Sequence, residues 1–261
     1  SLMSIWFREL DVVDNENIPQ EGGVMYVAWH PSGLIDPLLL HASLPGKLSI
    51  LAKHTLFKVP LLGRLIKAGG ALPIYRTSDS DDLEEARRKN QKMLEGVGEK
   101  ISNGGKLLLF PEGKTHTDSE VKKTKTGAAR IMLIALRMAE DKNNFAPNII
   151  PVGLHYSNSK KFRERGAVIL ERPMKLPNTP PIVEDDEMQQ TLDKQWVSQV
   201  TGFIEAELKR ASHSKISWED RRLIWQGRSV VYAERAIKSG EKIRRLSFAE
   251  SVLGARRMRA G

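Results

Sequence analysis

The chain has 261 residues, a formal net charge of +9 and no cysteine. The lack of cysteine excludes disulfides, a cysteine nucleophile and thiolate metal sites. Apolar residues make up 40% of the chain, which is enough to bury the core of one large α/β domain and excludes a largely disordered protein.

The positive charge is concentrated at one end of the chain. Lys209–Gly261 holds 14 Lys and Arg against 5 Asp and Glu, whereas the preceding residues hold 27 of each kind. This asymmetry indicates an electrostatic contact made by the tail, and an anionic membrane surface is the partner we expect. A basic tail also leaves open a nucleic-acid binder. Because no basic motif with interleaved aromatic residues is present, we expect no nucleic-acid partner.

No segment has the length and polarity of a membrane-spanning helix, which needs roughly 18 uncharged apolar residues. The nearest candidate, Leu48–Leu72, is interrupted by Lys, Arg, His and Pro. Its central part, 56–67, predicts either a helix that lies in a membrane interface or a core helix that covers a sheet. The N-terminal residues have no basic segment followed by an apolar run, so we expect no signal peptide.

In chain order, the first half of the sequence predicts strands followed by helices. Apolar and β-branched runs predict strands at 24–29, 48–52 and 70–75. Apolar residues at helical spacing predict helices at 34–42 and 79–102.

The second half continues this alternation. It predicts strands at 106–110, 148–154 and 167–170, and helices at 127–140, 187–210 and 218–259. Strands that alternate with helices of this length predict an α/β fold with a mixed, largely parallel central sheet flanked by helices. We divide the chain into an α/β domain, residues 1–208, and a basic helical C-terminal appendage, residues 209–261.

A histidine and an aspartate follow the first predicted strand. His30 and Asp36 are separated by a turn that contains Pro31 and Gly33. Histidine is the side chain best suited to general base catalysis near neutral pH, and a nearby carboxylate orients its ring. The alternative is an aspartate that caps a helix beside an unrelated loop histidine. Ser32 is not the expected nucleophile, because the GxSxG turn is absent.

Two further strands end on polar residues. Lys106–Phe110 runs into a tight turn with Glu112 and Gly113, where a backbone amide can face a developing oxyanion. The alternative is an ordinary turn with a solvated glutamate. The strand at 70–75 ends at Arg76, whose guanidinium matches phosphate, although a surface arginine after a strand is also common.

Four sequence blocks together carry a resemblance to a known family. They are WHPSGLIDP, GGALPIYR, LLLFPEGKT and IIPVGLHY, in this order, within Val12–Leu176. The chain resembles the phospholipid and glycerol acyltransferase superfamily, the PlsC-like glycerol-3-phosphate and 1-acylglycerol-3-phosphate acyltransferases. The family usually has four residues between the histidine and the aspartate, whereas this chain has five. A subgroup of glycerol-3-phosphate and dihydroxyacetone-phosphate acyltransferases is similar in this respect.

The resemblance implies roles by position. His30 acts as the base, Asp36 orients it, Glu112 organises the site and amides near Gly113 meet the oxyanion. The resemblance implies neither a metal nor a cofactor.

The resemblance also implies the substrates. Arg76, Lys114 and Thr115 bind the phosphate of the acceptor, and acyl-CoA or acyl-carrier protein donates the acyl group. Lys122, Lys123 and Lys125 form a basic loop, which either contacts a donor phosphate or is simply solvated.

The expected function is transfer of a fatty acyl group to glycerol-3-phosphate or dihydroxyacetone phosphate in phospholipid biosynthesis, at the cytoplasmic face of a membrane. The alternative acceptor is lysophosphatidate. From other classes, a non-catalytic lipid-binding protein and a nucleic-acid binder stay open. We interpret His54, His116 and His155 as surface or core histidines.

Overall fold

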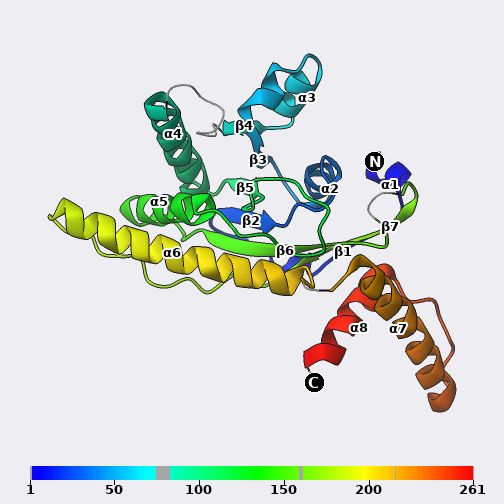
Figure 1. Ribbon diagram of the computed structural model, residues 1–261. Coiled ribbons are helices and arrows are strands. Elements are labelled where there is room, and N and C mark those ends of the chain that lie inside the picture. Colours follow the sequence, from blue (N-terminus) through cyan, green and yellow to red (C-terminus); the bar gives the residue numbers. More distant parts are fainter. Residues whose placement is uncertain (1, 75–82, 159–160, 215, 261) are drawn as a thin grey trace.

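A seven-stranded sheet forms the centre of the computed structural model, which describes residues 2–74, 83–158, 161–214 and 216–260 (Figure 1). The strand order within the described residues is β1-β7-β6-β2-β5-β3-β4. The strands are β1 (Phe7–Val13), β2 (Val24–Ala28), β3 (Leu48–Lys53), β4 (Ala71–Ile74), β5 (Lys106–Leu109), β6 (Asn148–Tyr156) and β7 (Glu164–Leu170). Six of these strands were expected, and β1 was not.

All neighbouring strands are parallel except β6 and β7, which confirms the mixed, largely parallel sheet. The carboxyl ends of β2, β5, β3 and β4 therefore lie along one edge of the sheet. Ligands of open α/β sheets bind outside the carboxyl ends of the strands. His30, Glu112 and His54 follow three of these strand ends, so the sheet gathers the polar residues at one edge.

Helices pack around the sheet, and α1 is one that the sequence did not predict (Figure 1). They are α1 (Leu2–Trp6), α2 (Ile35–Ser43), α3 (Leu62–Ala68), α4 (Leu83–Ser102), α5 (Gly127–Asp141), α6 (Asp186–Ala211), α7 (Trp218–Ser239) and α8 (Phe248–Ala260), with 3-10 turns η1 (Asn15–Asn17) and η2 (His54–Lys58). Figure 1 shows α6 running along the sheet, α3 beyond β4, and α7 and α8 at the opposite end. Within the described ranges, no helix combines the length and the hydropathy needed to cross a bilayer.

The main core lies around β2 and β6, the two central strands. Every residue of Val24–Ala28 is buried, as is Ile149–Tyr156. Pro151 lies in β6, which is an interior strand, although a proline there predicts an edge strand or a bulge. The pairing explains its tolerance: the antiparallel ladder between β6 and β7 begins one residue later, at Val152.

The C-terminal appendage is packed against the sheet rather than detached from it. A second apolar cluster joins α7 and α8 to β7 through Trp225, Phe248 and Ile169. The helix α6 continues to Ala211, so the predicted boundary at 208 falls within its last turn. The single helix predicted at 218–259 is wrong, because it breaks at Gly240, whose φ of 69° ends α7.

Candidate active site

The His30–Asp36 pair forms as predicted. β2 delivers His30 to the edge of the sheet, the turn at 31–34 reverses the chain, and α2 begins with Asp36 in its first turn. The His30 Nδ1 atom lies 2.8 Å from Asp36 Oδ2. The five-residue gap therefore still allows the two side chains to meet.

The Asp36 carboxylate is completely buried and accepts two hydrogen bonds besides that of His30. The Ser32 backbone N–H donates to Oδ2 at 2.7 Å, and the Tyr156 hydroxyl donates to Oδ1 at 2.6 Å. Burial, together with the charge of Asp36 and the hydrogen bond to it, raises the pKa of Tyr156 well above 10.0. Tyr156 therefore stays a donor, and Asp36 is held as an acceptor for the imidazole N–H.

The imidazole of His30 is fixed in orientation and still partly open to solvent. Its ring stacks on Phe110 with centroids 4.1 Å apart and planes 16° from parallel. The side chain keeps 16% of its surface exposed. With Nδ1–H donated to Asp36, the unprotonated Nε2 is the nitrogen left to accept a proton from a substrate.

Glu112 organises the backbone around His30, as the resemblance implies. Its buried carboxylate accepts from the His30 N–H at 2.9 Å and from the Lys122 N–H at 2.7 Å. The third partner is His116, whose Nε2 lies 2.7 Å from Oε1. Glu112 thus joins the end of β2 to the loop that follows β5.

Gly113 closes a narrow turn after β5. Its φ is 69°, and a Cβ at this position would lie only 2.9 Å from the side chain of Lys125. The Gly113 N–H donates to the Phe110 carbonyl at 3.0 Å, so in this structure the turn itself uses the amide that was expected to face an oxyanion. Glycine is favoured here by the positive φ, whereas the end of the flexible Lys125 side chain can move to make room.

The predicted phosphate-binding residues are placed only in part. Arg76 lies outside the described residues. Thr115 is exposed, and its methyl group would lie 3.9 Å from a Cβ placed on Gly33, in the turn between His30 and Asp36. Lys114 is exposed beside it. The basic loop is partly neutralised, because Lys122 pairs with Asp118 at 2.6 Å.

A cluster of aromatic rings and one arginine, which we call the Trp29 clamp, supports the site from the C-terminal appendage. Its members are Trp29, Trp218 and Arg221. The indoles of Trp29 and Trp218 stack with centroids 5.5 Å apart. The Arg221 guanidinium carbon lies 5.1 Å from the Trp29 ring and 4.8 Å from the Trp218 ring, within the range of cation–π attraction. Trp29 directly precedes His30, so the clamp fixes the chain next to the histidine of the His30–Asp36 pair.

The clamp also holds the loop that carries His116. Arg221 is buried and donates to the Ser119 carbonyl at 2.6 Å, and Trp218 Nε1 donates to the Thr117 carbonyl at 2.9 Å. The three other Arg221 hydrogen bonds go to carbonyls of its own segment, at residues 212, 213 and 216. Trp218 and Arg221 of the appendage thus hold the loop at residues 116–119 in place, and His116 of this loop contacts Glu112.

Four residues of this arrangement were not predicted from the sequence: Tyr156, His116, Trp218 and Arg221. Tyr156 ends the fourth sequence block and His116 follows Glu112 by four residues, so their positions near the motifs were a usable signal. Arg221 has no such signal, since its partners are about one hundred residues away. His116, interpreted from the sequence as a surface or core histidine, has a largely buried side chain that lies against the Glu112 carboxylate. Within the described part of the chain, no group of three or more His, Asp or Glu is arranged to hold a metal ion.

Comparison of this sequence with known proteins assigns the chain to a family. The sequence profile of the Acyltransferase family matches residues 9–155, more than half of the chain. A 1-acyl-sn-glycerol-3-phosphate acyltransferase of Borreliella burgdorferi is 24% identical over 60% of this chain and 56% of that protein. One of the same name from Chlamydomonas reinhardtii is 29% identical over 47% of this chain and 34% of that protein. An uncharacterized acyltransferase of Schizosaccharomyces pombe is 21% identical over 67% of this chain and 38% of that protein.

The chain spans between about a third and just over half of the length of these curated relatives. Among solved structures, the 1-acyl-sn-glycerophosphate acyltransferase PlsC of Thermotoga maritima gives a TM-score of 0.49 at 18% identity, over 78% of this chain and 75% of that one. The matched residues 9–155 contain His30, Asp36, Glu112 and Gly113. The chain belongs to the Acyltransferase family.

Proposed function

We propose that this chain transfers a fatty acyl group from an acyl thioester to a hydroxyl of a phosphorylated glycerol acceptor, in phospholipid biosynthesis. The observation that carries the proposal is the His30–Asp36 pair, held at 2.8 Å at the sheet edge. The acyl thioester of CoA or of acyl-carrier protein is a co-substrate, and the proposed reaction uses no cofactor.

His30 begins the reaction as a general base. Its Nε2 takes the proton of the acceptor hydroxyl, and the positive charge that forms on the imidazole is stabilised by the Asp36 carboxylate. Tyr156 and the Ser32 amide keep that carboxylate in place. The oxygen of the acceptor then attacks the thioester carbonyl carbon and forms a new C–O bond.

The second half of the reaction expels the thiol. Backbone amides of the turn around Gly113 stabilise the tetrahedral oxyanion, which requires the Gly113 N–H to exchange its bond to the Phe110 carbonyl. The C–S bond breaks as the carbonyl re-forms. The His30 imidazolium returns its proton to the leaving thiolate, so the enzyme ends in its starting state.

The acceptor is proposed to be glycerol-3-phosphate or dihydroxyacetone phosphate, because the chain has five residues between His30 and Asp36. Lysophosphatidate is the second candidate, since two relatives carry the name 1-acyl-sn-glycerol-3-phosphate acyltransferase. In either case Arg76, Lys114 and Thr115 are proposed to bind the phosphate of the acceptor.

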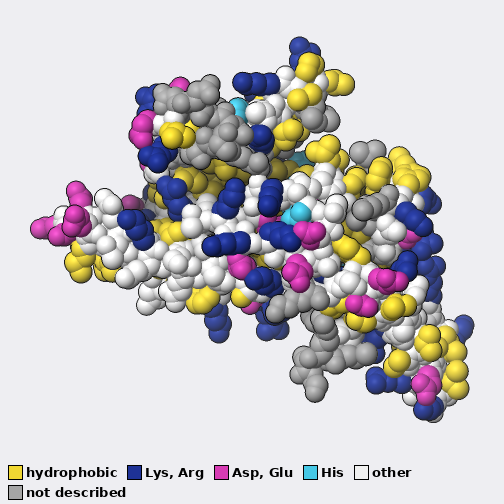
Figure 2. All heavy atoms as spheres, in the orientation of Figure 1, with side chains coloured by type: hydrophobic (Ala, Val, Ile, Leu, Met, Phe, Trp, Pro, Cys, Tyr) yellow, Lys and Arg dark blue, Asp and Glu magenta, His cyan; other side chains and the backbone are white. Residues whose placement is uncertain are grey.

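We further propose that the protein acts at the cytoplasmic face of a membrane, as a peripheral protein. The outer face of α7 presents Leu223, Val230 and Ile237, which are 57%, 69% and 67% exposed and spaced by seven residues. Figure 2 shows hydrophobic side chains at this lower right end of the molecule, beside Lys and Arg. The exposed Arg222 and Arg235 add attraction to anionic lipid of about 1 kcal/mol each.

Removal of the proposed general base, His30, should strongly reduce acyl transfer. We expect His30→Ala to lower kcat about 100- to 10,000-fold, the range typical of general base removal. The measurement is a panel of glycerol-3-phosphate, dihydroxyacetone phosphate and lysophosphatidate with long-chain acyl-CoA. In the same panel Arg76→Ala should raise the acceptor KM. Unchanged kcat in His30→Ala would refute the mechanism, and a wild type inert towards all three acceptors would favour a non-catalytic lipid-binding protein.

Tyr156→Phe should lower kcat by about 10- to 100-fold, because it removes a hydrogen bond to a buried carboxylate worth about 1.5–3 kcal/mol. The matched control is Tyr26→Phe, which removes the same atom from another buried tyrosine. The Tyr26 hydroxyl has no hydrogen-bond partner within the described residues, so we expect little change. Equal kcat values for the two variants would contradict the role of Tyr156.

Trp218→Ala should lower kcat by up to about 30-fold, because the lost indole stacking and the lost hydrogen bond to Thr117 together amount to about 2 kcal/mol. The control is Ser229→Ala on the same helix, where the side chain is exposed and lies outside the apolar stripe. Circular dichroism checks that both variants are folded. A Trp218→Ala enzyme with wild-type kcat would show that the Trp29 clamp is not needed for catalysis.

Val230→Asp should weaken sedimentation with phosphatidylglycerol-containing vesicles more than Ser229→Asp does. Both changes add one negative charge to α7, but only the first removes an apolar side chain from the exposed stripe. Vesicles of phosphatidylcholine alone measure the part that does not depend on lipid charge. Equal loss in the two variants would exclude burial of the stripe in lipid.

A further inference from the structure

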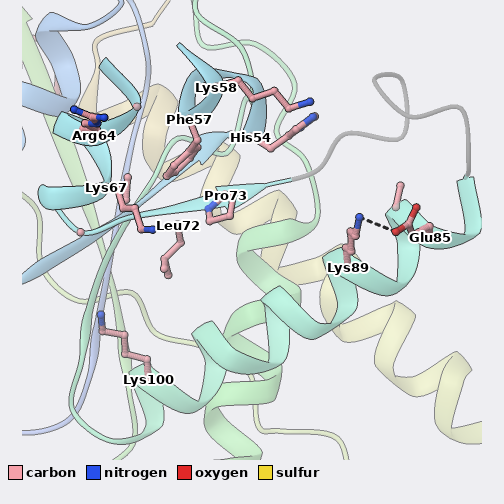
Figure 3. Close-up of a pocket in the computed structure, with 14 residues that line it drawn as sticks. His54, Phe57, Lys58, Arg64, Lys67, Leu72, Pro73, Glu85, Lys89 and Lys100 are labelled. Atoms are coloured by element: carbon pink, nitrogen blue, oxygen red, sulfur yellow. Dashed lines mark ion pairs between the residues drawn. The ribbon is translucent and has the colours of Figure 1, made fainter. Parts of the chain in front are cut away.

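A cavity of about 910 Å³ lies beside the edge strand β4, between α3 and α4 (Figure 3). None of its lining residues belongs to the His30–Asp36 site. The lining has an apolar part, formed by Phe57, Leu72, Pro73 and Ala86, and a strongly basic part. Its volume is that of a pocket for a ligand of about drug or nucleotide size, roughly 300–1,000 Å³, and far exceeds the needs of a single phosphate.

The basic part of the lining is only weakly neutralised. Five Lys and Arg face one Glu, which leaves a formal charge of +4 with His54 neutral. The only ion pair drawn within the cavity joins Lys89 to Glu85 at 2.8 Å, and Lys100 donates to the uncharged Ser49 hydroxyl at 2.5 Å. The remaining cations are Lys58, Arg64 and Lys67, which have no carboxylate within ion-pair distance among the described residues.

The cations are distributed around the apolar residues rather than clustered at one point. In Figure 3, Lys67 and Lys100 lie on one side of Leu72 and Pro73, and Lys58 and Lys89 lie on the other. A ligand that satisfies both groups must carry anionic groups at separate places, with a flat or apolar part between them. Glycerol-3-phosphate, which has one phosphate and three carbons, meets only one of these requirements.

The cavity is also near the reaction centre. β4 pairs with β3, β3 with β5 and β5 with β2, so three strand spacings, roughly 14 Å, separate β4 from the strand that carries His30. His54 and Phe57 follow the carboxyl end of β3, at the same edge of the sheet as His30. A donor whose thioester lies at His30 can therefore reach the cavity only through a long, flexible arm.

We propose that this cavity binds the nucleotide part of a CoA thioester, an inference that rests on the proposed acyl transfer. This moiety has a purine ring, a diphosphate and a separate phosphate monoester, which alone carries about −1.5 to −2 at pH 7. Its summed negative charge matches the positive charge of the lining. The ring packs against the apolar residues, and the phosphates contact Arg64, Lys67 and Lys100 on one side and Lys58 on the other.

The test is equilibrium binding of unacylated CoA and of adenosine 3′,5′-bisphosphate, measured by calorimetry on the full chain. In Arg64→Gln/Lys67→Gln we expect affinity for both to fall about tenfold or more, because two charge-assisted contacts are lost. The matched control is Lys92→Gln, an exposed lysine of α4 outside the cavity lining, which should bind as the wild type does. All three proteins should have the same melting temperature.

Other possible ligands of the cavity, lipid headgroups and the acceptor, predict different outcomes of these binding measurements. Equal CoA affinity in the wild type and in Arg64→Gln/Lys67→Gln overturns the proposal. So does a double variant that loses only its binding to phosphatidylglycerol vesicles, which assigns the cavity to lipid headgroups. Displacement of adenosine 3′,5′-bisphosphate by glycerol-3-phosphate assigns it to the acceptor and also overturns the proposal.

The binding assay is independent of turnover and is repeated in a His30→Ala background. If no acceptor is acylated but CoA binding still weakens in the double variant, the proposed function fails and the nucleotide site stands. If acyl transfer occurs but the double variant binds CoA normally, the nucleotide site fails and the proposed function stands.

Discussion

The buried carboxylate of Glu112 is the constraint on which the site depends. A carboxylate out of contact with water is tolerated only when hydrogen bonds compensate for its lost hydration. Glu112 obtains them from the His30 and Lys122 backbone amides and from His116, which belong to two different segments. The end of β2 and the loop after β5 are therefore fixed to each other before any substrate is present. His30 is oriented by its main chain through Glu112 and by its ring through Asp36 and Phe110.

The fold was largely predictable because its strands are buried and apolar. The predicted strand at 106–110 differs from β5 by one residue, since a parallel interior strand reads as a continuous apolar run. β1 was missed because Phe7–Val13 is only partly buried and contains three charged residues. The break at Gly240 was missed because helical spacing of apolar residues continues on both sides of it.

The candidate site was predictable where its residues are close in the sequence. His30 and Asp36 meet across one turn, and their pairing is confirmed. Tyr156 reaches Asp36 across 120 residues, and Arg221 reaches Ser119 across 102. Such contacts depend on which strands are neighbours, and spacing within one sequence does not contain that information.

The structure also shows that part of the excess positive charge of residues 209–261 is not available to an external partner. Several of these cations are used inside the protein: Arg221 is buried, Arg244 pairs with Glu250, and Arg245 pairs with Glu9. Pairing with Arg244 and the Ser247 amide lowers the pKa of Glu250 to about 2, so this pair stays charged across the physiological range. The Arg244–Glu250 pair already cancels in the net charge of the tail, but the buried Arg221 and the pairing of Arg245 with Glu9 do not, so this net charge overstates what the appendage offers to a membrane.

The contact between the first strand and the last helix has a consequence for synthesis on the ribosome. Glu9 and Asp11 accept hydrogen bonds from the first backbone amides of α8, at Phe248 and Ala249, across nearly 240 residues. The His30–Asp36 pair and the Tyr156 hydroxyl that contacts it need the chain only as far as residue 156, but the Trp29 clamp forms only when Arg221 has emerged, and α8 covers β1 later still. A nascent chain thus carries His30, Asp36 and Tyr156 before Arg221 is available to hold the loop at Ser119.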